Sequence, residues 1–323
     1  MIHPKVSVLM PVYNTEPSVL KESINSIINQ SFTDFEFLIL NDSPDNSNID
    51  NIVLSYSDSR VKYFKNSSNR GLEYSTNRLI KESQGEYIAI FDHDDISLTD
   101  RLKKEVEYLD DNPRVGMVSG QFTVFGKEYW TSDNPIESDD IKQRLSEVSC
   151  VSHTAMMVRS SILKENNLKY EKSFFPAASY RMITQIALVT EVHNLPDVLL
   201  RYRMDGNNTS LRNSKLREAA REKIRLSYVE DLKASKIKQI YKLDSVNVIN
   251  KPPYVDNRRY YKGVRGSDEF FIKSNDKTFA SEFKTSKMLH DNNGDLFIEP
   301  IDYYEDGSVN YLIMKWCDGV GLD

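Results

Sequence analysis

The sequence predicts an α/β fold built on a mostly parallel sheet with flanking helices. Apolar, strand-like runs alternate with amphipathic, helix-like segments through the first half of the chain. Each strand-like run ends in a polar turn, and parallel strands place such turns on one edge of their sheet. The run Gly85–Asp95 adds a third observation, because it is a strand-like segment that ends in three carboxylates. We therefore expect a ligand site at the carboxyl ends of the strands.

Strands are predicted where short runs of β-branched and aromatic residues occur, and helices where apolar residues recur at helical spacing. Val6–Met10 is an apolar strand ended by Pro11, and Ser18–Asn29 carries its apolar residues on one helical face. The chain therefore opens with a βα unit. The later predicted elements are the strand Phe35–Leu40, the helix Ile49–Tyr56, the strand Val61–Phe64, the helix Tyr74–Glu82, the acidic strand, the helix Leu98–Leu109 and the strand Val115–Gly120.

The acidic segment predicts a cation site. Asp92, Asp94 and Asp95 follow the apolar part of the strand directly. Carboxylates held within a few ångströms repel one another and raise each other's pKa unless a positive charge lies between them. Hard oxygen ligands suit Mg²⁺ or Mn²⁺, and these ions take phosphate oxygens as further ligands. A diphosphate is therefore the expected co-ligand.

The composition bounds the class of protein. With 323 residues the chain is long enough for two domains, and its net charge of -6 argues against a general nucleic-acid binder. Cys150 and Cys317 fit no metal-binding spacing, so we expect reduced, buried thiols. The N-terminus shows no signal peptide, and no apolar run approaches the ~20 residues that span a bilayer. We expect a cytoplasmic protein, and peripheral contact with the inner face of the cytoplasmic membrane is left open.

The turn residues, taken in order, resemble those of family 2 nucleotide-sugar glycosyltransferases. The shared motifs are Pro11–Asn14, Gln30–Glu36, Asn41–Ser43, Asn69–Leu72 with Asn77, Gly85–Ile88 and Asp92–Asp95. The resemblance covers roughly residues 4 to 210 and implies the GT-A fold, which is Rossmann-like. Within this region, Val151–Arg159 is similar to the family's acceptor-side strand and Leu195–Arg203 to its closing segment.

The resemblance implies a role for each turn. Pro11, Tyr13 and Asp42 would hold the nucleobase, and Asp92 the ribose side. The residues implied for the nucleotide are Pro11, Val12, Tyr13, Asn14, Asp42, Arg70, Asn77, Asp92 and His93. Asp94, with Asp92 and Asp205, would hold Mn²⁺ or Mg²⁺ on the diphosphate. These roles suit the residue types, because an aspartate can accept from a uracil ring N–H, an aromatic ring can stack on the base, and a metal neutralises charge on the departing diphosphate.

The same residues have purely structural interpretations. Tyr13 could be a core residue, Asn14 and Asp42 could be turn or helix-cap residues, and Asn69–Gly71 could be an ordinary helix entry. Turn residues with unrelated structural roles, however, would not be expected to lie together on one edge of one sheet. Asn41 stands where the family often has a first Asp.

The general base expected from the resemblance is missing. Where the family presents an acidic pair, this chain reads Phe175–Arg181, with Ser179 at the position of the acid. An inverting transfer needs a group that removes the acceptor hydroxyl's proton, and serine at neutral pH is a poor base. Three explanations stay open: another acid such as Glu171 or Asp205 acts, the transfer is a base-independent retaining one, or the site is impaired. Asp205 has two further interpretations, as a metal ligand and as a solvated loop residue.

The second half of the chain changes in composition. Asn213–Leu243 predicts a charged helix with one apolar face. The segments from Phe270–Lys273 to Tyr311–Trp316 resemble the N-terminal lobe of kinase-like sugar phosphotransferases. That resemblance would place Lys273 on the third strand, at the ATP phosphates, and Glu282 on the following helix as its ion-pair partner. No catalytic Asp motif follows, so we expect a partial, truncated lobe.

These inferences predict a GT-A domain over residues 1–212, a helical linker over 213–250 and a small α+β kinase-like lobe over 251–323. The expected function is a metal-dependent, inverting hexosyltransferase that moves a sugar from a UDP-sugar to a saccharide or lipid-linked acceptor. Such a reaction would serve surface polysaccharide synthesis, of capsule, lipopolysaccharide or O-antigen. Two alternatives are left open: a catalytically impaired, sugar-nucleotide-binding pseudo-enzyme, and one part of a bifunctional glycosyltransferase and sugar kinase.

Overall fold

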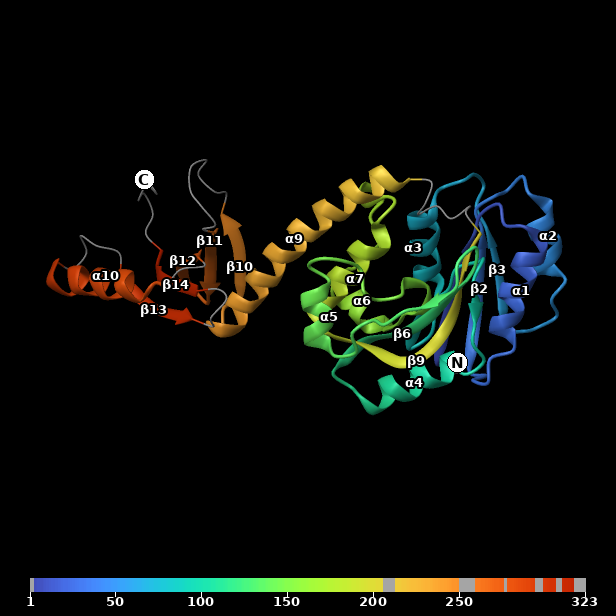
Figure 1. The fold of residues 1–323 in the computed structure, drawn as a ribbon, viewed down its shortest axis with the longest axis horizontal. Coiled ribbons are helices and arrows are strands. Elements are labelled where there is room, and N and C mark those ends of the chain that lie inside the picture. Colours follow the sequence, from blue (N-terminus) through green and yellow to red (C-terminus); the bar gives the residue numbers. More distant parts are fainter. Residues whose placement is uncertain are drawn as a thin grey trace. The chain divides into compact units, whose positions relative to one another are not determined.

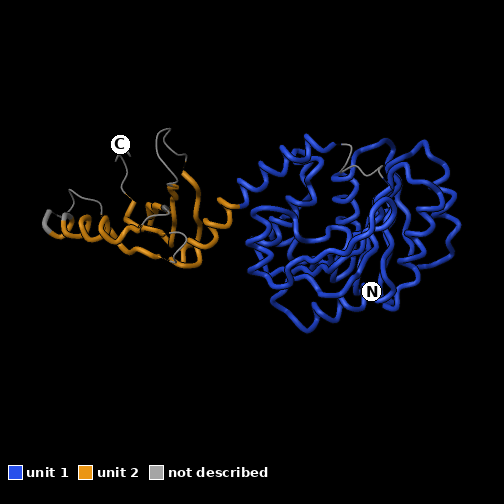
Figure 2. Tube along the Cα trace, in the orientation of Figure 1, with its two compact units in different colours: residues 1–228 blue, residues 229–323 orange. Residues whose placement is uncertain are grey.

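The chain forms two compact units, residues 1–228 and 229–323, which Figures 1 and 2 show in a computed structural model. The structure describes residues 3–205, 213–249, 259–275, 278–293, 299–305 and 310–316. The division between the units lies inside the long helix α9 (Ser214–Ile240). Each unit has its own sheet and its own apolar core.

The sheet of unit 1 has the strand order β3-β2-β1-β4-β8-β6-β9-β5, and β7 pairs with β6. β1 to β4 run parallel, as do β6 and β9, whereas β8 runs antiparallel to both β4 and β6. The strands are β1 (Val6–Val12), β2 (Phe35–Asn41), β3 (Val61–Lys65), β4 (Tyr87–Ile90), β5 (Ile96–Ser97), β6 (Val115–Gly126), β7 (Trp130–Thr131), β8 (Met157–Arg159) and β9 (Glu191–Met204). The prediction of an α/β fold with a mostly parallel sheet is confirmed.

The central strands are buried along their whole length. All seven residues of β1 and all seven of β2 are buried. Continuous apolar runs of this kind suit parallel strands, because helices cover both faces of the sheet. Figure 1 shows α1 and α2 on one side of these strands and α3 on the other.

The helices of unit 1 begin and end close to the predicted positions. α1 starts with Pro17 at its first turn, where a missing N–H costs nothing, and the Glu16 side chain accepts the N–H groups of Ser18 and Val19. Apolar residues of α1, α2 and α4 pack with those of β1, β2 and β4 in one core. The helices are α1 (Pro17–Ile28), α2 (Ser47–Leu54), α3 (Leu72–Glu82), α4 (Arg101–Asp111), α5 (Ser138–Arg144), α6 (Ser160–Glu165) and α7 (Ala178–Val189), with the short 3₁₀ helices η1 (His153–Ala155) and η2 (Lys172–Phe174).

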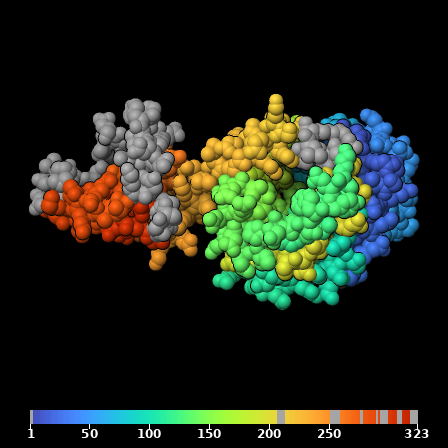
Figure 3. All heavy atoms as spheres, in the orientation of Figure 1, coloured from blue at the N-terminus to red at the C-terminus, as the bar shows by residue number. Residues whose placement is uncertain are grey.

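The strand order reverses at β1, and this reversal locates the expected ligand site. β2 and β3 lie on one side of β1, whereas β4 lies on the other. The carboxyl ends of β1 and β4 are therefore neighbours at the point of reversal, and open α/β sheets bind ligands outside the carboxyl ends of their strands at such a point. Figure 3 shows the surface of unit 1 hollowed between green and yellow segments of the chain.

Unit 2 is an antiparallel sheet with apolar clusters on both faces. Its strand order is β10-β11-β12-β14-β13. Ile237 and Leu243 join one cluster with β11, β12 and β14, and Phe279 and Phe283 join the other. The elements are β10 (Ser245–Ile249), β11 (Arg259–Arg265), β12 (Asp268–Asn275), α10 (Ala280–Asn293), β13 (Pro300–Glu305) and β14 (Asn310–Lys315).

Two other sequence features can be placed. Cys150 is buried as a free thiol, whereas Cys317 lies outside the described residues. Among the described helices, none combines the length and the apolar character that crossing a bilayer requires.

Candidate active site

The turn after β4 carries the acidic residues that the sequence identified. Asp95 is fully buried, whereas Asp92 and Asp94 are only partly buried. Burial, reinforced by the charge of Asp94, raises the pKa of Asp92 to about 7, although Arg101 acts in the opposite direction. Burial and the charges of Asp94 and Asp92 also raise the pKa of Asp95. We call the segment Asp92–Asp95 the acid turn. A cation would relieve the repulsion that these shifts report.

The acid turn fits a cation shared with a diphosphate better than an all-protein metal site. The described residues contain no group of three or more His, Cys, Asp or Glu side chains arranged to hold a metal. Ions that bridge phosphates, however, need only one or two protein carboxylates and fill the remaining positions from phosphate and water. Asp94 is close enough to Asp92 for its charge to raise the pKa of Asp92, and both side chains are still accessible, so they meet this smaller requirement.

A buried arginine connects the strand end that precedes the acid turn to η1. Arg101, the first residue of α4, donates to the carbonyl oxygens of Ile90 and Thr154, both at 2.9 Å. Its Nε lies 3.2 Å from the buried Glu105 carboxylate, one helical turn along. The Thr154 hydroxyl in turn accepts the backbone N–H of Asp92 at 2.9 Å. Arg101 therefore joins the end of β4 to η1. The sequence suggested only that Arg101 lies near a helix start, and nothing in the local pattern marks it as buried.

The loop after β1 faces the acid turn. Pro11 and Val12 are buried as the last residues of β1, and Tyr13 beyond them is 50% exposed. The Thr15 hydroxyl and Nδ1 of His93 share a hydrogen bond of 2.8 Å. Burial lowers the pKa of His93, against the charge of Asp94, which raises it. The half-exposed Tyr13 ring is not a core residue, so its face is available to a ligand.

Asp42 organises the turn that precedes α3. Its Oδ1 accepts from Asn66 Nδ2 at 2.6 Å and from the Arg70 N–H at 2.9 Å, and its Oδ2 accepts from the Gly71 N–H at 2.8 Å. The Asp42 N–H donates to the carbonyl of Val12 at 2.9 Å, which places Asp42 beside the end of β1. A carboxylate offers about four acceptor positions, so three donors leave room for one more.

Asn14 and Arg70 flank the same edge. Asn14 adopts a left-handed φ of 46° and donates its N–H to the Ser43 hydroxyl at 2.8 Å. The Arg70 guanidinium lies 4.1 Å from the ring centroid of Tyr74. Both residues therefore border the loops implied for the nucleotide, and their direct role in binding stays a prediction.

Asn77 engages the backbone of a distant segment. Its Nδ2 donates to the Tyr170 carbonyl at 2.8 Å, and its Oδ1 accepts the Tyr170 N–H at 2.9 Å. The Tyr170 hydroxyl and His153 Nε2 share a hydrogen bond of 2.8 Å. Burial lowers the pKa of His153 to about 4, and burial together with the charge of Asp92 raises the pKa of Tyr170. The structure thus brings Tyr170 near the acid turn, which the sequence reasoning missed because Asn77 and Tyr170 are 93 positions apart.

The three candidate bases lie just before η2, in α7 and just after β9. Ser179 is the second residue of α7 and is partly buried. The Glu171 Oε1 accepts from Gln185 Nε2 at 3.2 Å and lies 3.6 Å from Arg181 Nε, so α7 holds Glu171 against itself. Asp205 is exposed and follows the end of β9. Glu171 and Ser179 therefore belong to one corner of the unit, and which of the three acts as base stays a prediction.

In unit 2, Lys273 and Glu282 form an ion pair. Lys273 lies on β12 and Glu282 in the first turn of α10. Their side chains are 24% and 41% exposed. Phe271, two residues before Lys273 on β12, packs with Leu312 in one apolar cluster. The part that this pair plays in any phosphoryl chemistry stays a prediction.

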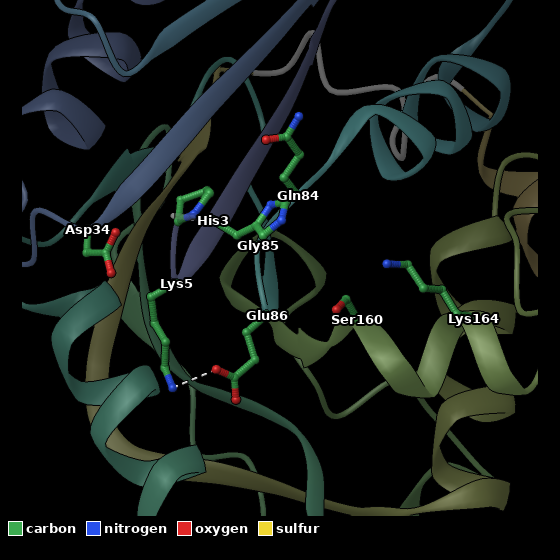
Figure 4. A pocket seen from close by; sticks show the side chains of 9 residues that line it. His3, Lys5, Asp34, Gln84, Gly85, Glu86, Ser160 and Lys164 are labelled. Atoms are coloured by element: carbon green, nitrogen blue, oxygen red, sulfur yellow. Dashed lines mark hydrogen bonds and ion pairs between the residues drawn. The ribbon is translucent and has the colours of Figure 1, made fainter. Parts of the chain in front are cut away.

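A separate pocket lies at the opposite edge of the sheet of unit 1. Figure 4 shows it near the start of β1 and β4, with the ion pair of Lys5 and Glu86 at 2.8 Å. Its volume is about 340 Å³. Lys5 also pairs with Asp110 at 2.9 Å. This pocket is at the amino ends of the strands, away from the residues that the sequence implicated, and we assign it no part in the chemistry.

Comparison with known sequences gives consistent matches. The family described as glycosyl transferase family 2 matches residues 7–166. An uncharacterised glycosyltransferase of Methanocaldococcus jannaschii is 33% identical over 224 residues, which are 65% of this chain and 74% of that protein. The UDP-Glc:alpha-D-GlcNAc-diphosphoundecaprenol beta-1,3-glucosyltransferase WfgD of Escherichia coli is 32% identical over 120 residues, which are 37% of this chain and 46% of WfgD.

Comparison with solved structures gives the fold. S. aureus TarS 1-349 in complex with UDP-GlcNAc superposes with a TM-score of 0.55 and 17% identity, over 63% of this chain and 60% of the crystallised one. The mannosyltransferase PcManGT from Pyrobaculum calidifontis, in complex with GDP-Man and Mn2+, gives a TM-score of 0.50 and 16% identity, over 74% and 75% of the two chains. The α/β architecture of unit 1 is therefore GT-A-like. From the sequence match and the fold together, this chain belongs to glycosyl transferase family 2.

Proposed function

We propose that this chain transfers a sugar from a UDP-sugar to a saccharide or lipid-linked acceptor during surface polysaccharide synthesis. One observation carries the proposal: Tyr13, Asp42 and the acid turn meet at the edge where the strand order reverses. A base-stacking ring, a spare carboxylate acceptor and a cluster of carboxylates that can hold a cation are what a nucleotide diphosphate needs. The UDP-Glc in the name of WfgD and the UDP-GlcNAc bound to TarS support the choice of a uridine nucleotide.

Each group at the site has a defined task in this proposal. Asp94 and Asp92 would hold Mn²⁺ or Mg²⁺, which would supply positive charge to the departing diphosphate. The Mn2+ in the PcManGT complex supports a divalent ion. Asp42 would accept the ring N–H of uracil while it keeps the turn at Arg70 in place. Arg101 holds the end of β4, just before the acid turn, through the carbonyl oxygen of Ile90.

The proton of the acceptor hydroxyl would pass to Glu171 or Asp205 in an inverting transfer, because Ser179 cannot act as a base. If Ser179 stands where the base belongs, Ser179→Asp should raise the transfer rate and leave UDP affinity nearly unchanged, since general bases are worth about 10²–10⁴ in rate. Glu171→Gln and Asp205→Asn are the matched controls. A large loss from either control identifies the acting acid. No gain and no loss in all three variants would contradict the inverting assignment.

The direct test of the function is an assay of the full chain with a panel of UDP-sugars and Mn²⁺, with and without a diphosphoundecaprenol-linked sugar as acceptor. Transfer to the acceptor is expected for one or few donors. Hydrolysis of the donor without transfer would support an enzymatic function and would exclude this acceptor. UDP binding without hydrolysis or transfer would favour the pseudo-enzyme.

A second candidate function concerns unit 2. We propose that the predicted lobe over residues 251–323 binds a nucleoside triphosphate, because the Lys273–Glu282 ion pair joins the third strand of an antiparallel sheet to the helix that follows it. In kinases such a pair positions a lysine at the phosphates. ATP with Mg²⁺ should raise the melting temperature of the full chain, and Lys273→Ala should remove that rise. An equal rise in Lys273→Ala would refute this role.

The proposed location is the cytoplasm, at the inner face of the cytoplasmic membrane, where a lipid-linked acceptor would lie. The helix α9 carries many Lys and Arg residues, which favour contact with anionic lipid. Co-flotation with phosphatidylglycerol vesicles at low salt, and its loss at high salt, would support this contact; no co-flotation at low salt would exclude it.

A further inference from the structure

The end of β9 is fastened to the acid turn. The backbone N–H of Arg203 donates to Asp95 Oδ1 at 2.9 Å, and Arg203 Nε donates to the carbonyl oxygen of Asp94 at 2.8 Å. Arg203 is 108 residues away from Asp95 in the sequence. Two distant segments are therefore joined at the place where the cation is expected.

Two more elements hold the same contacts in place. The Glu22 carboxylate of α1 pairs with the Arg203 guanidinium, which also lies 4.6 Å from the ring centroid of Phe125. The Ser23 hydroxyl, again from α1, donates to the carbonyl of Asp95 at 2.6 Å. A planar guanidinium that meets a carboxylate, a carbonyl and an aromatic ring is restricted to one orientation.

The accessibility of the three acids separates their roles. A ligand of a phosphate-bridging ion must share the ion with phosphate and water, so it needs an open side. Asp92 and Asp94 are partly exposed, whereas Asp95 is 0% exposed and uses one oxygen for Arg203. Its other oxygen, Oδ2, is buried as well. Asp95 therefore stabilises the acid turn from its buried side.

We infer that Asp95 and Arg203 are positioning residues that fix the carbonyl of Asp94 and the point where Asp205 leaves β9, and that Asp95 is not a metal ligand. This inference rests on the proposed function, because it concerns the arrangement of the same site. Asp205 comes two residues after Arg203, so a fastened Arg203 also restricts the approach of Asp205. Groups that orient metal ligands typically change metal affinity about 10–100-fold.

The test is the Mn²⁺ concentration that gives half of the UDP-dependent rise in melting temperature of the full chain. Asp95→Asn keeps an acceptor oxygen for the Arg203 N–H, so its Mn²⁺ midpoint should stay within about 3-fold of the parent. Arg203→Ala removes the donor to Asp94, so its midpoint should rise about 10-fold. Melting temperatures without ligand show whether each variant is folded.

The outcomes are distinct. Loss of the Mn²⁺-dependent rise in Asp95→Asn would make Asp95 a ligand and overturn the inference, as would an unchanged midpoint in Arg203→Ala. If Arg203→Ala does not fold, Arg203→Lys replaces it, because lysine keeps the charge beside Glu22 but not the planar Nε donor. Its midpoint should also rise, and an unchanged one overturns the inference. A parent chain without any Mn²⁺-dependent rise would instead refute the proposed function itself.

Discussion

Buried carboxylates at the two edges of the sheet in unit 1 differ in their hydrogen-bond partners and in the charges beside them. At the amino ends of the strands, Glu36 is 3% exposed and fully paired. Its Oε1 accepts from the Ser7 hydroxyl at 2.5 Å and the Gln84 N–H at 2.7 Å, and its Oε2 pairs with Lys62. At the carboxyl ends, burial together with the charges of neighbouring carboxylates in the acid turn raises the pKa values of Asp92 and Asp95.

This difference distinguishes a structural carboxylate from a candidate functional cluster. A buried carboxylate with donors on both oxygens is complete and stabilises the fold. Buried, neighbouring carboxylates with raised pKa values are typical of functional sites, and a positive charge beside them would stabilise their ionised forms. The amino edge is therefore a structural support, and the carboxyl edge is where we propose that a charged ligand binds.

The largest expected effect comes from the acid turn. Asp94→Ala should abolish the difference between UDP stabilisation with Mn²⁺ and with EDTA, and should lower transfer about 10²–10³-fold, because the diphosphate loses its electrostatic partner. Differential scanning fluorimetry and a transfer assay measure both. A variant that keeps the metal dependence of UDP stabilisation would show that Asp94 does not hold the ion.

The matching change at the amino edge is Glu36→Ala. It removes the acceptor of the Ser7 hydroxyl and leaves the Gln84 N–H only its longer bond to Ser7 Oγ, at 3.2 Å, so the free energy of unfolding should fall by about 1–3 kcal/mol. Denaturant titration measures the loss. Glu36→Gln, which keeps an acceptor oxygen, should lose less, and neither variant should change the metal dependence of UDP binding. If Glu36→Ala impaired UDP binding while still folded, the two edges would not be independent.

Asp42 combines both kinds of role. Asp42→Ala should weaken UDP binding by about 1–3 kcal/mol if its spare acceptor position takes the uracil N–H. It should also lower the melting temperature, because three donors lose their acceptor. Calorimetry on the folded variant separates the two effects. Unchanged UDP affinity would leave Asp42 as a turn residue only.

The smallest effect concerns acid stability near the site. The pKa of His153 is lowered by burial to about 4, so the unfolded chain binds this proton more readily than the folded one between about pH 6.5 and 4. Stability should therefore fall as pH decreases through that window, by an amount on the order of 1–3 kcal/mol. His153→Asn should flatten this part of the curve of unfolding free energy against pH. A parallel curve for the variant would contradict the burial of a neutral His153.

The sequence predicted the parts of the fold that depend on local pattern. The strands at Val6, Phe35 and Val61 and the intervening helices carry continuous apolar runs or helical periodicity, and these are sufficient. The predicted strand Val151–Arg159 is only partly a strand. Its first half forms η1, because Thr154 must place its hydroxyl at Asp92 and its carbonyl at Arg101.

The proposed site residues that the sequence indicated sit in turns after strands, as with Tyr13, Asp42 and Asp94. The sequence did not indicate the residues that support them. Arg101 and Arg203 act on partners up to 53 and 109 positions away, and no local pattern reports such contacts. The sequence thus indicates the groups that we propose to contact the ligand, whereas the structure is needed to find the groups that position them.

One measurement tests the contrast between the edges most directly: isothermal titration of UDP into the full chain with Mn²⁺ and, separately, with EDTA. We expect UDP to bind clearly more tightly with Mn²⁺, because the ion supplies positive charge between the diphosphate and the carboxylates of Asp92 and Asp94. Glu36→Gln should bind UDP like the parent in both conditions. Equal affinity with Mn²⁺ and EDTA would contradict a cation site at the acid turn.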